Sequence, residues 1–324
     1  MSNAAQAGAG RVSGAGRVRD YAPTYGALAA LVLLLVINSV FTPNFFDVNN
    51  FRNILLQVAP TVLVAVGMTL VIATGGIDLS VGSVMAIASA VAATQLDKFG
   101  AGAAVLLALA AATCVGAFNG ALISGFRIQP IIVTLALLIS GRGVAQVISR
   151  GGQLIPFTNP SFEYLGKGTP AGVPVQVIVM AAAVAVAVFL MRATAFGRYV
   201  VAVGGNEAAA RLAGVKVHRT KITVYALSGL LAGLAGLIET ARLGASDAQK
   251  VGLNIELDAI AATVVGGTPL TGGRATVLGT LVGALIMQVI TTGFVMNGIS
   301  YSWSLVIKAA IIIVAVYVQR PKVA

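Results

Sequence analysis

The stretch NILLQVAPTVLVAVGMTLVIATGGI, residues 53–77, contains no charged side chain and decides the class of fold. A helix of about 20 apolar residues is long enough to cross the roughly 30 Å hydrocarbon core of a membrane. Residues 21–46, 99–126 and 168–191 form charge-free windows of the same kind. The sequence therefore predicts a chain that crosses a membrane several times.

The composition of the whole chain agrees with this interpretation. Of its 324 residues 58% are hydrophobic and only 10% are charged, and the mean hydropathy is +0.94. A soluble domain carries about 25% charged residues, so a soluble enzyme, a disordered chain, a collagen and a disulfide scaffold are all excluded. The single cysteine, Cys114, lies in an apolar run, and the single histidine is His218. We therefore expect no disulfide, no metal site and no cofactor.

We predict an all-α polytopic membrane protein with about ten transmembrane helices. The predicted spans are residues 24–42, 53–74, 80–94, 101–123, 130–148, 173–191, 221–242, 255–267, 275–295 and 303–319. The third and eighth spans are short enough to be half-helices or re-entrant segments, so counts of eight, nine or eleven also fit the pattern. Residues 1–22 read as a flexible cytoplasmic tail, residues 23–320 as one transmembrane domain, and residues 321–324 as a cytoplasmic C-terminus.

The distribution of positive charge predicts the orientation. With the N-terminus in the cytoplasm, thirteen Lys and Arg residues fall in cytoplasmic segments and six in outer segments. Positive residues are enriched on the cytoplasmic side of membrane proteins, so we expect both termini in the cytoplasm. The net charge of +11 is scattered among loops without interleaved aromatic residues, which argues against nucleic acid as a partner.

One long loop, residues 192–221, is predicted to face the cytoplasm. Within it Asn206 can cap a short helix whose first turn contains Glu207, and Gly214 can end that helix. A helix of two turns is unstable alone in water. It must therefore pack either on its own transmembrane bundle or on a cytoplasmic partner.

Three motifs carry a resemblance to a known family. They are GGIDLSVGS at residues 75–83, NEAAARLAGV at 206–215 and DAIAATVVGGT at 258–268. With these motifs the chain resembles, over roughly residues 25–320, the membrane permease subunits of bacterial ATP-binding-cassette (ABC) importers of the ribose, galactose and xylose type. The resemblance implies the type II fold of ABC importer permeases.

The resemblance also implies partners and a coupling site. In this family a short cytoplasmic helix sits in a groove of a separate ATPase subunit and transmits its motion. Carried over, the ATPase-coupling residues are Asn206, Glu207, Ala208, Ala209, Arg211 and Gly214. The general importer motif has three residues between Glu-Ala-Ala and Gly, whereas four stand here. The other implied partners are a periplasmic sugar-binding protein and a second permease, identical or paralogous, in the inner membrane.

The chain has no nucleotide-binding loop of its own. The segment Gly166-Lys167-Gly168-Thr169 lacks the first glycine of a P-loop, and no GxGxxG pattern lies between a strand and a helix. We therefore predict that the chain is not an enzyme and that the energy for transport comes from the partner ATPase.

Many of the 38 glycines stand at helix-packing or helix-breaking positions. Pairs spaced by four residues, such as Gly116 with Gly120, let helix backbones approach closely; the other pairs are Gly229 with Gly233 and Gly279 with Gly283. Two glycine-rich breaks also match at an offset of 191 residues: Gly75, Gly76 and Gly82 align with Gly266, Gly267 and Gly273. We interpret them as two related irregular elements in the transporter interior. Chance is the alternative, because apolar, glycine-rich segments often resemble one another.

Polar side chains inside the predicted spans are candidates for a translocation path. Gln57, Asn119 and Gln288 have amides that suit the hydroxyl groups of a neutral sugar. Interhelical hydrogen bonds and ion pairs, such as Glu239 with Lys308, explain such residues equally well. Asp78 precedes a predicted helix and is expected to cap it.

Together these observations predict translocation of a monosaccharide by alternating access, driven by the partner ATPase. One alternative is a permease for branched-chain amino acids, but the spans show no clear charge pair for an amino acid. A second is an ion-coupled secondary transporter or channel, which needs carboxylates in the middle of a span. A third is a scaffold without transport, which needs no docking loop. The sequence does not identify the sugar or distinguish a homodimer from a heterodimer.

Overall fold

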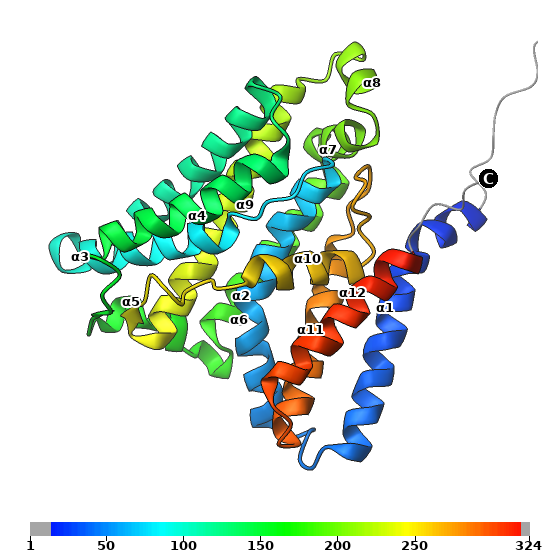
Figure 1. Ribbon diagram of the computed structural model, residues 1–324. Coiled ribbons are helices and arrows are strands. Elements are labelled where there is room, and N and C mark those ends of the chain that lie inside the picture. The colour runs from blue at the N-terminus through cyan, green and yellow to red at the C-terminus, as the bar shows by residue number, and fades with distance from the viewer. Residues whose placement is uncertain (1–13, 319–324) are drawn as a thin grey trace, which may run out of the picture.

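The computed structural model describes residues 14–318, and most of them are helical (Figure 1). The helices are α1 (Gly14–Phe41), α2 (Val48–Ala73), α3 (Val81–Gly125), α4 (Pro130–Ile148), α5 (Pro160–Lys167), α6 (Val175–Ala193), α7 (Ala195–Gly205), α8 (Glu207–Leu212), α9 (Val217–Leu243), α10 (Ile255–Val265), α11 (Val277–Met296) and α12 (Tyr301–Val318). A 3-10 turn, η1 (Pro170–Gly172), and two short strands, β1 (Ile155–Pro156) and β2 (Ala245–Ser246), complete the described elements.

Helices lie over all ten predicted spans, with boundaries that differ by a few residues except at the start of α1, which begins at Gly14 and not at residue 24. Two of those spans form the single helix α3, which Gly100 interrupts with non-helical dihedral angles. Among the described residues, six helices are long and apolar enough to cross a membrane: α2, α3, α4, α6, α9 and α11. The apolar parts of α1 and α12 are shorter, and α10 has only 11 residues. The helical class is confirmed, whereas the count of ten crossings stays a prediction.

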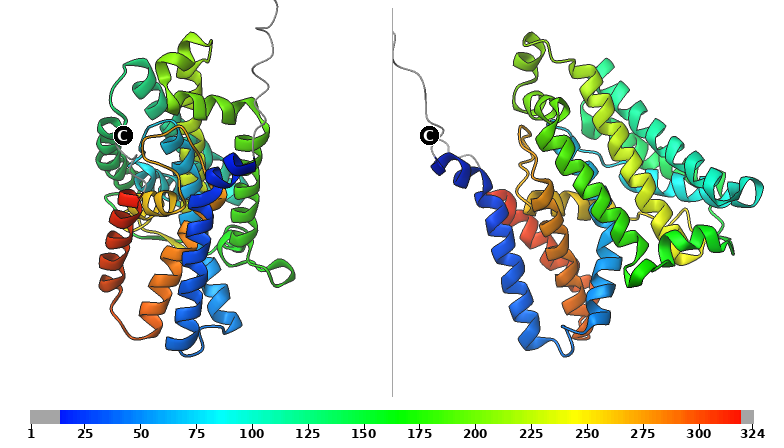
Figure 2. Two further views of the ribbon diagram at one scale, coloured as in Figure 1. Left: turned by 90° about the vertical axis from the view of Figure 1, so that its right-hand side faces the viewer. Right: turned by 180° about the vertical axis from the view of Figure 1, so that it is seen from behind.

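The helices form two flanks around a central pair. In Figure 1 the helices α3, α4 and α9 lie together on one flank, α1, α11 and α12 lie on the other, and α2 and α10 lie between them. The view from behind in Figure 2 shows α1 at the edge of the molecule, packed on α11. The largest group of fully buried apolar residues joins α2, α3, α9, α10 and α11.

Glycine allows the close approach of α3 and α9. A Cβ atom at Gly116 would stand 3.1 Å from the Cα atom of Gly229 and would overlap the carbonyl oxygen of Tyr225. A Cβ atom at Gly283 would overlap the carbonyl oxygen of Ala262 in the same way. The predicted packing role of these spaced glycines is therefore confirmed.

Two contacts between segments far apart in the sequence agree with the predicted topology. Strands β1 and β2 pair antiparallel, which joins the loop before α5 to the loop after α9. At the opposite ends of α3 and α9, Ser124 Oγ lies 2.8 Å from His218 Nδ1. The predicted topology places β1 and β2 outside and the helix ends at Ser124 and His218 in the cytoplasm, so each contact joins segments that are expected on one side.

Several details differ from the sequence-based expectations. Helix α1 begins at Gly14, within the segment expected to be a tail; residues 1–13 and the C-terminal segment 321–324 lie outside the described residues. The ammonium group of Lys308 lies 3.1 Å from Asp258 and not beside Glu239, the partner named in one of the alternatives. An ion pair of Lys308 is thus present, but with another partner, because α12 packs on α10 and α11.

Candidate functional site

The predicted cytoplasmic helix is present as α8, and its ends have the expected chemistry. Asn206 has an extended backbone, and its Oδ1 atom accepts a hydrogen bond of 2.9 Å from the N–H group of Ala209. Glu207 lies in the first turn, where a carboxylate complements the helix dipole. Gly214 has a φ of +82°, which a residue with a side chain adopts only at a cost, and the helix ends just before it.

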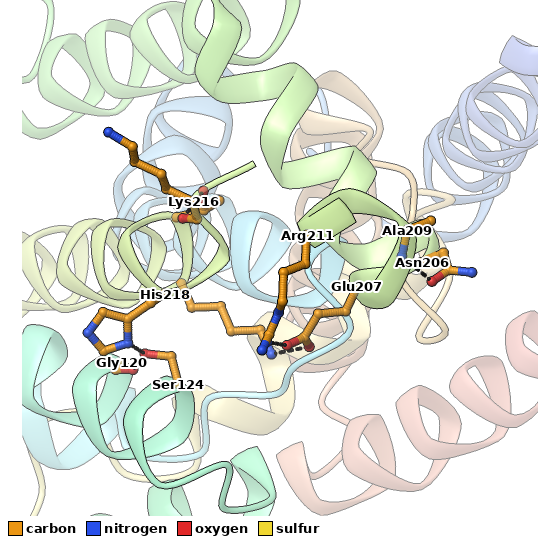
Figure 3. Close-up of polar contacts among 10 residues, drawn as sticks. Gly120, Ser124, Asn206, Glu207, Ala209, Arg211, Lys216 and His218 are labelled. Carbon is orange, nitrogen blue, oxygen red and sulfur yellow. Dashed lines mark hydrogen bonds and ion pairs between the residues drawn. The ribbon is translucent and has the colours of Figure 1, made fainter. Parts of the chain in front are cut away.

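The carboxylate of Glu207 ties α8 to the start of α9 (Figure 3). Its Oε2 atom lies 2.6 Å from the ammonium group of Lys221, and its Oε1 atom lies 3.0 Å from the guanidinium of Arg211. The hydrogen bond from Lys221 lowers the pKa of Glu207 below its ordinary value, and Arg211 adds to this effect. Glu207 therefore fixes the position of α8 by bonds within the chain.

The two faces of α8 have different environments. Ala210 is buried at 5% exposure in an apolar group with Val203 and Val217. Ala208, Ala209 and Arg211 are exposed, and the side chain of Leu212 is 91% exposed. Leu212 was not among the predicted coupling residues. The sequence signal that could have identified Leu212 is that it is the one large apolar residue in this helix of six residues.

Helix α7, directly before α8, was not predicted. Its buried residues Gly197, Val200 and Val203 recur every third position, which is a helical spacing that could be read from the sequence.

The last turn of α7 has no room for a side chain at Gly204. A Cβ atom there would overlap the carbonyl oxygen of Ala73 and stand 2.6 Å from the backbone nitrogen of Gly273.

Backbone from three distant segments meets at this point. The N–H group of Gly273 donates a hydrogen bond of 3.0 Å to the carbonyl oxygen of Ala73. A Cβ atom at Gly272 would stand 2.8 Å from the backbone nitrogen of Gly75. We call these five residues, Ala73, Gly75, Gly204, Gly272 and Gly273, the glycine junction. It connects the end of α2 and the α10–α11 loop to the residues just before α8.

The other predicted glycines lie in separate packing contacts. A Cβ atom at Gly76 would stand 2.5 Å from the hydroxyl oxygen of Tyr225, and one at Gly82 would stand 2.9 Å from Glu256 Oε2. Gly266 packs against Gly279, and Gly267 has a φ of +92°. Of the aligned glycines, only Gly75 and Gly273 are part of the glycine junction, where Gly75 contacts Gly272 and Gly273 contacts Ala73 and Gly204.

Asp78 lies in a buried polar cluster between α2 and α3. Its Oδ1 atom accepts hydrogen bonds from the N–H and hydroxyl groups of Ser80, and its Oδ2 atom accepts one of 2.9 Å from Ser228 of α9. The cap residue of α3 is Ser80, so the expected capping role of Asp78 was displaced by two positions. Asn119 joins the same cluster, because its Nδ2 atom donates to Ser80 Oγ at 2.9 Å.

The other two candidate path residues lie together. Gln288 Nε2 donates a hydrogen bond of 2.9 Å to Gln57 Oε1 and a second one to Thr292. The pair joins α2 to α11, and Gln57 is exposed. Asn119 is not part of this pair and is fully buried. The structure thus brings two of the three candidates together and places the third elsewhere.

Comparisons with known proteins relate this arrangement to a family. The family described as "Branched-chain amino acid transport system / permease component" matches residues 50–316. The ribose import permease protein of Escherichia coli strain K12 is 44% identical over 300 residues, which cover 91% of this chain and 93% of the relative. The galactofuranose transporter permease protein of the same strain is 42% identical over 304 residues, which cover 91% of this chain and 89% of the relative.

A third relative comes from a distant bacterium. The fructose import permease protein of Bifidobacterium longum strain NCC 2705 is 36% identical over 311 residues, with 92% of this chain and 87% of the relative covered. No solved structure matches the chain significantly. Because the family match and these relatives both span most of the sequence, the chain belongs to the family of membrane permease subunits of bacterial ABC sugar importers.

Proposed function

We propose that the chain carries a monosaccharide into the cytoplasm through alternating access, driven by a separate ATPase subunit that docks on α8. The observation that carries this proposal is the exposed face of α8. A helix of six residues is unstable alone, yet this one is capped by Asn206 and held by Glu207. It presents Leu212 to solvent at 91% exposure, and a large apolar side chain held in that way suits a groove in a partner.

The glycine junction supports the transmission of motion from α8. Gly204 lies two residues before Asn206, and it is packed against Ala73 at the end of α2 and Gly273 before α11. Tightly packed backbone has no space to absorb a displacement. A shift of α8 caused by the ATPase therefore moves α2 and the α10–α11 loop together. That movement is the step that opens the path alternately to each side.

The remaining parts of the importer follow from the same proposal. All ten predicted spans cross the membrane, both termini lie in the cytoplasm, and a second permease, identical or paralogous, completes the path. The amides of Gln57 and Gln288 can bond sugar hydroxyl groups on the way. A periplasmic binding protein delivers the sugar to the outer loops 45–52, 150–172 and 245–254.

The class of substrate is supported by the relatives. The named relatives are import permeases for ribose, galactofuranose and fructose, which are monosaccharides. The description of the family keeps branched-chain amino acids as a second candidate. Uptake of labelled ribose, galactofuranose, fructose and leucine by a strain that lacks the chain, with and without the restored gene, distinguishes them. Restoration of leucine uptake alone would replace the sugar proposal.

The docking role of α8 is tested with two exposed leucines that the predicted topology places on opposite sides of the membrane. Leu212→Asp is expected to abolish co-purification of a Walker-motif ATPase with the tagged chain from native membranes, because a charge enters an apolar groove. Leu154→Asp is the matched control, since Leu154 is 59% exposed in the outer loop before β1. The control should retain the ATPase. Equal retention in both variants would show that the ATPase docks elsewhere.

A further inference from the structure

A basic pocket lies at the cytoplasmic ends of α3 and α9, beside α8. Its volume is about 520 Å³, and the residues that line it are Ser124, Gly125, Arg127, Arg211, Lys216, Val217, His218 and Arg219. Four of these eight residues carry a positive charge, and none is acidic. We call this cavity the basic pocket.

Most of the positive charge in the basic pocket is unbalanced. Arg211 is paired with Glu207. Among residues 25–317, whose side chains the structure describes, Arg127, Lys216 and Arg219 have no carboxylate within ion-pair distance. Three like charges around one cavity repel each other, and water and salt screen this repulsion only in part. An anion in the cavity would remove the repulsion.

The geometry of the lining selects among anions. Arg127 has a φ of +56°, a value that residues with side chains rarely adopt, and this backbone directs the chain between α3 and α4 at the edge of the basic pocket. The Ser124 hydroxyl donates to the carbonyl oxygen of Gly120 and lies 2.8 Å from His218 Nδ1, which leaves the second ring nitrogen of His218 for further hydrogen bonds (Figure 3). Two guanidinium groups and an ammonium match the several oxygens of a phosphate group better than the two of a carboxylate.

The surroundings of the basic pocket point to the membrane as the source of the phosphate. Helices α3 and α9 are both candidate membrane spans, and the pocket lies where one ends and the other begins. Phe126 is 75% exposed between the pocket residues Gly125 and Arg127, and Ile128 is exposed just beyond them. Cations beside exposed apolar side chains at the end of a span suit a phospholipid, whose headgroup and acyl chains need both surfaces.

We propose that the basic pocket is a phosphate-binding site that holds the headgroup of an anionic phospholipid from the cytoplasmic leaflet. The bound headgroup links the α3–α4 loop to the first turn of α9. Lys221 of that same helix pairs with Glu207 of α8. The bound lipid therefore stabilises the start of α9, to which α8 is anchored. This site is separate from the sugar path and includes α8 only through Arg211, and it does not depend on the identity of the substrate.

The experiment measures the thermal unfolding midpoint of the full-length chain, purified in a neutral detergent. The midpoint is compared without and with each of three added compounds: phosphatidylglycerol, the zwitterionic phosphatidylcholine, and inorganic phosphate. A ligand that binds only the folded chain raises the midpoint. The pocket variant is Arg127→Gln with Arg219→Gln. The control variant, Arg198→Gln with Arg274→Gln, removes the same charge from cytoplasmic residues outside the pocket.

Phosphatidylglycerol is expected to raise the midpoint of the unaltered chain and the control variant by several degrees, and that of the pocket variant by less than half as much. A pocket-dependent rise with inorganic phosphate but not with phosphatidylglycerol would keep the phosphate site and assign it to a soluble ligand. Equal responses of both variants to every addition would overturn the proposal. Because each variant is compared with itself, a change in its basal stability does not obscure the result. Native mass spectrometry provides a second readout as the number of bound phosphatidylglycerol molecules.

Discussion

The carboxylate of Glu207 and the ammonium of Lys221 lie fourteen residues apart in the chain and meet at 2.6 Å, across the boundary between α8 and α9. The bond gives the short helix a fixed orientation relative to a membrane-spanning one. Arg211 bonds the same carboxylate from within α8. Only the bond with Lys221 therefore connects two elements, and the two bonds should contribute differently.

Removal of Lys221 is predicted to loosen α8 more than removal of Arg211. Arg211→Ala should change the opening free energy of α8 by no more than about 0.5 kcal/mol, because exposed pairs four residues apart contribute little. Lys221→Met should lower it by about 1–2 kcal/mol, since it removes a hydrogen bond to a charged group whose lysine is 15% exposed. Hydrogen exchange of the α8 amide groups measures both effects. Equal protection in the two variants would contradict the anchoring role of Lys221.

The same bond predicts how α8 responds to acid. Its hydrogen bond with Lys221 lowers the pKa of Glu207 below the ordinary value of 4.5. A lowered pKa means that the stabilisation is fully present above the ordinary value and is lost as the pH falls through the folded-state pKa. Helix α8 should therefore stay ordered from neutral pH down to the ordinary pKa of glutamate, and loosen only in more acidic solution.

A spin label at position 208 reports this transition. The label is introduced as Ala208→Cys in a Cys114→Ala background, because Cys114 is exposed. Its mobility should be constant across the neutral range and rise in acid. In the Glu207→Gln variant the acid step should disappear, since no carboxylate titrates there. An acid step of the same size in that variant would assign the transition to another group.

Two neighbouring glycines test the glycine junction. Gly204→Ala inserts a Cβ atom onto the carbonyl oxygen of Ala73, whereas Gly205→Ala meets no atom within 4 Å. Overpacking of a close contact costs about 1–3 kcal/mol, and alanine in open helical space is neutral or favourable. We expect Gly204→Ala to abolish sugar uptake without preventing co-purification of the ATPase, and Gly205→Ala to retain both. Normal uptake by Gly204→Ala would show that the glycine junction does not transmit motion.

The sequence was sufficient for features that depend on neighbouring residues. Apolar windows with few charges located the long helices, Asn206 located the start of α8, and glycines four residues apart located the close contacts between helices. Residues brought together by packing could not be found in this way. Asp258 rather than Glu239 pairs with Lys308, because the packing of α12 selects the partner.

The glycine junction shows the same limit. The sequence predicted that the breaks around Gly75 and Gly273 are related, but no local pattern indicated that their backbones meet. The contact also includes α7, whose Gly204 packs against Ala73 and Gly273. Leu212 was missed for a related reason. A leucine in a short helix can be buried or exposed, and the packing of α8 on α7 and α9 decides which.

The Asp78 cluster gives a last prediction, on the stability of the break between α2 and α3. Asp78 accepts hydrogen bonds at both carboxylate oxygens, from Ser80 and from Ser228, and it is fully buried. Asp78→Asn replaces one acceptor by an NH₂ donor, which then faces a hydroxyl group whose hydrogen must be redirected. A buried polar group that loses its partner costs about 1–3 kcal/mol.

Ser228→Ala is the matched variant, because it removes one donor and leaves the bonds between Asp78 and Ser80 in place. We expect Asp78→Asn to lower the thermal unfolding midpoint more than Ser228→Ala. The double variant should lose less than the sum of the two, because both single changes break the same bond. Additive losses would mean that the two side chains act independently, and the link between α9 and the break would then depend on apolar packing alone.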